Sequence, residues 1–227
     1  VWNRVLNVDK TCTLDVESNG KKATSNTTNP GIFFQGNGKI KSTIEEGADV
    51  TIKDNAGSGI YTKQKVCDLT IGSATITNNG SGTVNKSGIG AEKGGGIYNI
   101  GTIKLGKGVT ITGNTAQSGG GIYTKGGKVT IDGGKVISNT ATNGNGGGVY
   151  AISGTVTATD CDISDNDAGQ YNGGGICAQN SALTLEKNTL NRNKSKSGGA
   201  IWMNASDAEL MGNTITHNTC LLYTSDA

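Results

Sequence analysis

The sequence predicts an all-β protein, a right-handed parallel β-helix in which each coil of a solenoid is one repeat. Three observations predict this fold. A short glycine-led motif recurs, an asparagine column runs in step with it, and no segment shows the apolar spacing of a helix. Repeats of this size fold only when stacked. We expect one domain over residues 1–219, with about seven coils of 25–28 residues and three short strands each.

The first repeated element is an Ile or Val followed by an aromatic residue or Cys, usually behind a run of glycines. Its seven copies are Ile32-Phe33, Ile60-Tyr61, Ile97-Tyr98, Ile122-Tyr123, Val149-Tyr150, Ile176-Cys177 and Ile201-Trp202. Successive copies lie 28, 37, 25, 27, 27 and 25 residues apart. Because alternate residues of a strand point to opposite faces, we expect the aliphatic residue to point inward and the ring outward.

The second element is a column of asparagines, each preceded by an aliphatic residue three positions earlier. The column contains Asn55, Asn79, Asn114, Asn139, Asn166, Asn193 and Asn218. An Asn amide can bond the equivalent amide of the next coil, and Asn tolerates a left-handed bend. We therefore expect a structural ladder with each Asn at a left-handed bend. The same register should place Val136 between Ile111 and Ile163.

The third element is a short apolar alternation ten or eleven residues before most of these asparagines, as in Leu69-Thr70-Ile71. Residues 1–30 are expected to form an N-terminal turn, with a strand at 13–16 and a loop at 21–30. The repeat of 37 residues contains an insertion near Gly80–Lys93. Polar, glycine-rich insertions of this kind are expected to bulge from the solenoid as loops.

Both ends of the chain look truncated. The last eight residues, 220–227, resemble the translation of a sequencing adapter, so they are expected to be a non-native tail outside the fold. No charged and apolar leader is visible. No apolar run approaches the roughly 18 residues of a membrane helix, so this segment is not expected to insert into a membrane.

Composition excludes several functions. The formal charge of +2 is small and mixed in sign, so no nucleic-acid partner is expected. A single histidine provides neither a metal cluster nor a Ser-His-Asp set, and no metal or cofactor is predicted. Apart from Cys220, the cysteines Cys12, Cys67, Cys161 and Cys177 fit neither a zinc ribbon nor a CxxC pair. We interpret each as a buried apolar residue, although a Cys161–Cys177 disulfide is conceivable.

The segment Gly198-Gly199-Ala200-Ile201 and its variants at 94–97, 119–122, 146–149 and 173–176 resemble the GGAI motif of polymorphic outer-membrane protein repeats. More broadly, residues 31–218 resemble right-handed, pectate-lyase-like β-helix repeats of bacterial surfaces, including autotransporter passengers. The FxxN motif that usually accompanies GGAI in these proteins is absent. The resemblance therefore implies only the class of bacterial surface proteins, and not the polymorphic membrane proteins themselves. The resemblance implies an extracellular or cell-surface location, on a scaffold that carries lyases, hydrolases and adhesins alike.

Two sets of residues are candidates for function. A row of outward rings, formed by Tyr61, Tyr98, Tyr123, Tyr150 and Trp202, could stack on sugar faces, or could stack only on itself. The acidic segment 160–167 contains Asp162 and Asp165, and the register places Asp165 beside Arg192 and then His217. This line could serve a polysaccharide lyase or glycoside hydrolase, or could be a surface ion pair.

The sequence therefore favours a non-catalytic segment of a secreted or cell-surface protein. Such a stalk or adhesin-like passenger would present sheet faces to a polysaccharide or to a host or cell-surface protein. The alternative is a polysaccharide lyase or glycoside hydrolase that uses carboxylates around Asp160–Asp167.

Overall fold

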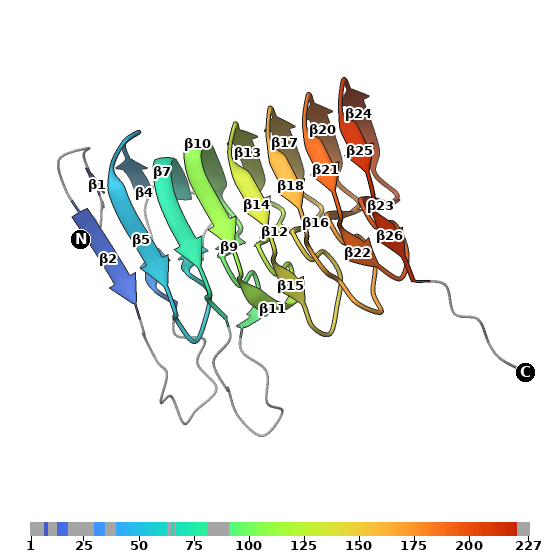
Figure 1. The fold of residues 1–227 in the computed structure, drawn as a ribbon. Helices are drawn as coiled ribbons and strands as arrows, with labels where there is room; N and C mark the ends of the chain where they lie inside the picture. Colours follow the sequence, from blue (N-terminus) through green and yellow to red (C-terminus); the bar gives the residue numbers. More distant parts are fainter. Residues whose placement is uncertain are drawn as a thin grey trace, which may run out of the picture.

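The computed structural model of the chain describes residues 7–8, 13–17, 30–34, 40–62, 65, 67–80 and 91–221. Within these ranges the regular structure is entirely β-strand. The strands stack in chain order along one axis, from β1 and β2 at one end to β24, β25 and β26 at the other (Figure 1). The predicted parallel solenoid is therefore confirmed.

Each coil contributes strands to three faces that surround the core. Faces 1 and 2 belong to one 14-stranded sheet, because the long strands β7 (Cys67–Thr77) and β10 (Thr102–Thr112) run through both. The rest of face 1 is β1 (Asn7–Val8), β4 (Ile40–Ile44), β13 (Lys128–Asp132), β17 (Thr155–Thr159), β20 (Ala182–Glu186) and β24 (Asp207–Met211). The rest of face 2 is β2 (Thr13–Glu17), β5 (Asp49–Lys53), β14 (Lys135–Ile137), β18 (Asp162–Ser164), β21 (Thr189–Asn191) and β25 (Thr214–Thr216).

Face 3 is a separate seven-stranded sheet made of the glycine-led motif. Its strands are β3 (Ile32–Phe34), β6 (Ile60–Thr62), β9 (Ile97–Asn99), β12 (Ile122–Lys125), β16 (Val149–Ile152), β19 (Ile176–Gln179) and β23 (Ile201–Asn204). Short strands follow face 2 in several coils and form two further small sheets. These strands are β8 (Ala91–Lys93), β11 (Thr115–Ser118), β15 (Thr140–Ala141), β22 (Lys194–Ser195) and β26 (Thr219–Cys220).

The core is a set of aliphatic columns in register from coil to coil. Val136 pairs with Ile111 on one side and Ile163 on the other, as the repeat predicts. All three side chains are fully buried. Parallel strands at about 4.8 Å place such residues directly above one another, so each coil completes the core of its neighbours.

The asparagine column is a continuous buried ladder. Asn139 accepts hydrogen bonds at Oδ1 from the backbone N and the Nδ2 of Asn114, each at 3.0 Å. Its own Nδ2 donates to Oδ1 of Asn166 at 3.1 Å and to the carbonyl of Ile111 at 3.0 Å. The pattern recurs at Asn79, Asn166 and Asn193. Each asparagine thus joins three coils, and none of these amides is left unpaired.

One expectation about this ladder is wrong. The left-handed residue is the one before each asparagine, as at Ser138 with φ of 55° and Asp165 with φ of 58°. The ladder asparagines themselves have no positive φ. The physical reason is that the preceding residue makes the sharp turn and points outward, whereas the asparagine side chain must point inward to reach the next coil.

The ends of the chain also differ in part from expectation. The strand predicted at 13–16 is confirmed as β2, which pairs with β5. Cys220, expected to lie outside the fold, pairs with Ser195, and the backbone N of Leu221 donates to the Ser195 carbonyl at 2.8 Å. The repeat therefore continues two residues beyond 219. The insertion residues 81–90, the loop at 21–29 and the tail 222–227 lie outside the described residues.

We predict that Asn139→Ala lowers the free energy of unfolding by about 3–5 kcal/mol, because it leaves several buried donors and acceptors without partners. Chemical denaturation followed by circular dichroism measures the change. Gln170→Ala is the matched control, since this exposed amide has no such role, and it should change stability by less than about 0.5 kcal/mol. Equal effects of the two substitutions would contradict a stabilising ladder.

Candidate functional site

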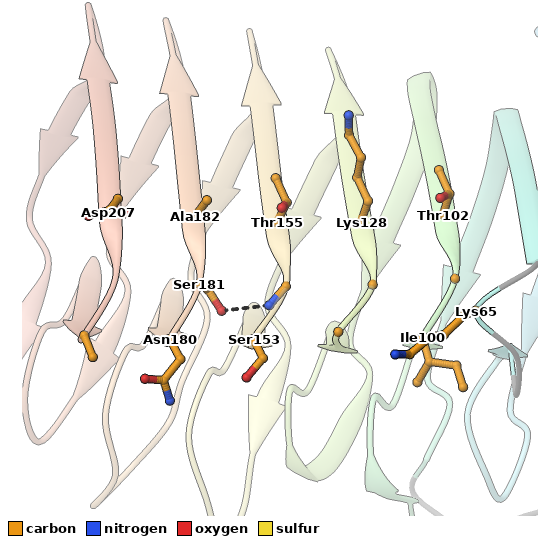
Figure 2. A pocket seen from close by; sticks show the side chains of 15 residues that line it. Lys65, Ile100, Thr102, Lys128, Ser153, Thr155, Asn180, Ser181, Ala182 and Asp207 are labelled. Carbon is orange, nitrogen blue, oxygen red and sulfur yellow. Dashed lines mark hydrogen bonds between the residues drawn. The ribbon is translucent and has the colours of Figure 1, made fainter.

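A groove of about 580 Å³ follows the bend between face 3 and face 1. We call it the axial groove, because it crosses successive coils parallel to the solenoid axis (Figure 2). Its lining residues are Lys65, Ile100, Gly101, Thr102, Gly126, Gly127, Lys128, Ser153, Gly154, Thr155, Asn180, Ser181, Ala182, Ala205 and Asp207. Sequence reasoning missed this groove, although the polar bends after each face 3 strand were a signal for it.

Strand register builds one side of the groove. The first residues of the face 1 strands lie side by side in five coils, in the order Thr102, Lys128, Thr155, Ala182 and Asp207. Figure 2 shows these five side chains as one row across the strands. Because successive strands are about 4.8 Å apart, the row offers one side chain per coil at a nearly constant spacing.

Residues with a left-handed backbone conformation form the other side of the groove. Gly126, Ser153, Asn180 and Ala205 occupy equivalent positions with φ of 65°, 50°, 47° and 47°. Ser153, Asn180 and Ala205 are exposed, and Ser153 and Asn180 lie in a second row below the first in Figure 2. A residue in this conformation turns the chain sharply, so its side chain is directed away from the core.

Hydroxyl groups fix the bend beneath these residues. Oγ of Ser181 accepts a hydrogen bond from the backbone N of Gly154 at 3.2 Å, and Oγ of Ser206 accepts one from the backbone N of Ser181 at 3.0 Å. Gly127 permits the close packing of the adjoining coil, because a Cβ there would lie 2.6 Å from the carbonyl oxygen of Gly101. The floor of the groove is therefore pre-organised.

The charges of the groove are separated along its length. Lys65 and Lys128 lie toward the coils of β7 and β13, and Asp207 begins β24. Among the residues that line the groove, Asp207 is the only carboxylate, and none is His or Cys. Glycoside hydrolysis uses a pair of carboxylates. The lining of the groove therefore contains no carboxylate pair of the kind that glycoside hydrolysis uses.

The acidic segment lies at a different bend, on face 2. Arg192 Nε and Nη2 donate to the two carboxylate oxygens of Asp165 at 2.7 and 2.8 Å, so the predicted neighbours do meet. His217 occupies the next position of the line, because Asn191 pairs with Thr216, but its side chain contacts Asn191, with Nδ1 3.3 Å from Oδ1. Asp162 accepts a hydrogen bond from the Ser164 hydroxyl.

The electrostatics of this pair do not suit acid–base catalysis. The hydrogen bond from Arg192 lowers the pKa of Asp165, and the same contact raises the pKa of Arg192. A general acid needs a raised carboxyl pKa and an arginine base needs a lowered one. The pair is also exposed, with side-chain exposures of 38% for Asp165 and 60% for Arg192. This geometry matches the surface ion-pair alternative.

The outward rings form a column of aromatic contacts on face 3. Ring centroids are 4.3 Å apart for Tyr61 and Tyr98, and 5.3 Å apart for Tyr98 and Tyr123, both stacked. Tyr123 and Tyr150 meet edge to face at 5.5 Å. Partial burial and the neighbouring phenols raise the pKa of Tyr98 to about 12. The rings therefore contact one another, as the self-stacking alternative predicts.

The expectation of an exposed ring row is wrong for its centre. Tyr123 and Tyr150 are only 2% and 7% exposed. The glycine-rich segment before each strand folds back over the ring base, since a Cβ at Gly146 would lie 2.6 Å from Cβ of Tyr150. Tyr61, Tyr98 and Trp202 are half-buried. A sugar ring therefore cannot lie flat along the whole column.

The described cysteines agree with the apolar interpretation. Cys67, Cys161 and Cys177 are free and buried, whereas Cys220 is exposed. The conceivable Cys161–Cys177 disulfide is absent. Burial raises the pKa of Cys177 to about 12 and that of Cys67 to about 11. Cys12 lies outside the described residues.

Neither a metal cluster nor a membrane helix is found in the part of the chain that the structure describes. No group of three or more His, Cys, Asp or Glu side chains converges there. The same residues contain no helix long and apolar enough to cross a membrane.

The fold and the groove define a β-solenoid with a polar groove along its axis. A family model described as the right-handed beta helix region matches residues 95–227, which is more than half of the chain. The chain therefore belongs to the right-handed β-helix family, in agreement with the predicted winding. The comparison with curated proteins returned no match. Nor did the comparison with solved structures.

We predict that the Asp165–Arg192 contact stabilises the fold only while Asp165 is ionised. Its folded pKa is depressed, so the contribution is present above the ordinary carboxyl pKa and is lost as pH falls through the folded value. NMR titration should show a lowered Asp165 pKa in the wild type and a normal one in Arg192→Gln. Stability should differ slightly between the two at neutral pH and coincide in strong acid. An unchanged Asp165 pKa in the variant would refute the pairing.

We predict that a thiol reagent labels Cys220 in the folded protein while Cys67, Cys161 and Cys177 stay unlabelled. Burial and raised pKa values keep these three as thiols, and the thiolate is the reactive form. Peptide mass spectrometry locates the label, and the same reaction in denaturant should label Cys67, Cys161 and Cys177 as well as Cys220. Rapid labelling of Cys177 in the folded protein would show that the coil opens readily.

Proposed function

We propose that this chain is a non-catalytic segment of a secreted or cell-surface β-helix protein that binds an extended polysaccharide in the axial groove. The observation that carries the proposal is the row from Thr102 to Asp207, which presents one side chain per coil beside a second row of left-handed residues. A linear polymer of sugar units is a ligand that repeats along one axis. The groove repeats in the same way.

The chemistry of the lining supports a glycan rather than an apolar partner. Thr102, Ser153, Thr155 and Asn180 offer hydroxyl and amide groups, which both donate and accept hydrogen bonds as sugar hydroxyls do. Ile100 is the one large apolar residue of the lining, and it is half-buried. A protein interface of this size would normally be centred on aromatic anchors, and the lining contains none.

The rigid floor reduces the entropic cost of binding. The serine hydroxyls under Gly154 and Ser181 fix the bend before any ligand arrives. The backbone of both rows of groove residues is fixed by the stacked sheet, so it loses little conformational entropy when a ligand binds. Lys65 and Lys128 toward one end of the groove and Asp207 at the other end would orient a chain that carries charge. A location outside the cell, where polysaccharides occur, fits this function.

We predict that Thr155→Trp, which fills the middle of the groove, weakens polysaccharide binding at least about tenfold, because the bulky ring displaces the ligand from its hydrogen-bonding groups. The control is Thr157→Trp, two residues further on the same outward side of β17 but outside the groove lining. Affinity gel electrophoresis against a panel of neutral and acidic polysaccharides measures both. Circular dichroism should show that both variants remain folded.

Two lysine substitutions, one inside the groove lining and one outside it, test the contribution of charge to binding. Lys128→Ala should weaken binding and reduce its salt dependence, whereas Lys104→Ala, on the neighbouring strand and outside the lining, should not. Equal retention of wild type and Thr155→Trp on every retained polysaccharide, or no retention at all, would refute the proposal. Release of new reducing ends or unsaturated sugars would favour a lyase or hydrolase instead.

A further inference from the structure

We propose that Asn143 is a site of spontaneous deamidation, and that Tyr171 of the next coil accelerates it. Asn143 and Gly144 lie in the loop between β15 and β16, remote from the axial groove, and Asn143 is exposed. In this reaction the backbone nitrogen after an asparagine attacks the side-chain carbonyl carbon. A following glycine leaves that approach sterically open, because it has no Cβ.

The fold blocks the reaction at the other described Asn-Gly pairs. The backbone N of Gly80 donates to the Asn55 carbonyl, that of Gly146 to the Asn172 carbonyl and that of Gly173 to the Ser197 carbonyl, each at 2.9 Å. A nitrogen held in a hydrogen bond between coils cannot turn toward its neighbouring side chain. The Asn79 amide is also locked in the buried ladder.

At Asn143 and Gly144, neither the glycine nitrogen nor the asparagine side chain is held in this way. Within the described residues, the backbone N of Gly144 makes no hydrogen bond, while the backbone N of Asn143 is held by the Gln117 carbonyl at 3.2 Å. Residues 142–145 form a bend, in which the backbone N of Thr142 also bonds the coil before, through the Ala116 carbonyl at 2.8 Å. The attacking nitrogen is therefore not held by a hydrogen bond, while the asparagine that it attacks is anchored.

The side chain of Tyr171 is a second, independent reason to expect fast deamidation of Asn143. Its hydroxyl donates to Oδ1 of Asn143 at 2.6 Å. The backbone of Tyr171 is fixed on both sides, since its N donates to the Ala168 carbonyl and its carbonyl accepts from the N of Lys196, each at 2.9 Å. A donor at this oxygen polarises the side-chain carbonyl and stabilises the negative charge that develops when the nitrogen attacks.

The atoms balance without any cofactor. The Gly144 nitrogen loses its proton and bonds to Cγ of Asn143, and the former amide group leaves as ammonia with that proton. The resulting succinimide is opened by one water at either carbonyl, which gives aspartate or isoaspartate. Each product adds one negative charge to the loop, and isoaspartate also lengthens its backbone. Because Nδ2 of the nearby Asn145 lies 3.4 Å from the Tyr150 hydroxyl, the change falls next to the aromatic column.

The test is incubation of the whole chain at mildly alkaline pH, with peptide mass spectrometry and an isoaspartate assay. Asn143 should convert at least about tenfold faster than Asn79, Asn145 or Asn172, and unfolding in denaturant should remove most of this difference. Tyr171→Phe should slow conversion of Asn143 about tenfold. Tyr61→Phe, a ring of the aromatic column, is the matched control and should leave the rate unchanged.

Three outcomes would overturn the inference. The first is no faster conversion at Asn143 than at Asn145 in the folded chain. The second is a rate at Asn143 that Tyr171→Phe leaves unaltered, which would remove the role of the hydroxyl. The third is equal retardation by Tyr171→Phe and Tyr61→Phe, which would indicate a general change in loop stability. Circular dichroism of each variant separates loss of folding from loss of the accelerating contact.

Discussion

Hydrogen bonding between coils is the interaction on which the rest of the structure depends. A coil of about 26 residues buries too few aliphatic side chains to offset the entropy of ordering its own backbone. The buried side-chain amides add the stabilisation between coils that one coil lacks. Asn114, Asn139 and Asn166 each bond the coil before and the coil after. They satisfy groups that water cannot reach and set the coil-to-coil register of every other column.

This constraint also shapes the surface. Once register is fixed, outward side chains must form rows at the spacing of the strands, and the axial groove is the pair of such rows at a bend with free space above it. Where the glycine-rich segment folds back, as over Tyr123 and Tyr150, the row closes and its rings stabilise the sheet instead. The proposed binding function thus arises from the same repetition that holds the chain together.

Most of the fold could be predicted from the sequence, because each repeated position reports one physical requirement. The inward aliphatics, the asparagine ladder and the contact of Asp165 with Arg192 all follow from register alone. The covering of outward side chains by other segments, and the shape of the groove, could not be predicted in the same way. Alternation places Tyr123 outside the core but does not show that another segment covers it. The groove likewise needs the turn angle at Ser153 and its equivalents, which residue spacing does not specify.

Amide hydrogen exchange in the native state tests the central claim most directly. The backbone amides of Asn114, Asn139, Asn166 and Asn193 donate to ladder oxygens, so their exchange should require global unfolding. Their opening free energies should match one another and equal the free energy of unfolding. Exchange at these four sites as fast as at the backbone N of Gly144, which makes no hydrogen bond within the described residues, would show that the coils are not held by the ladder.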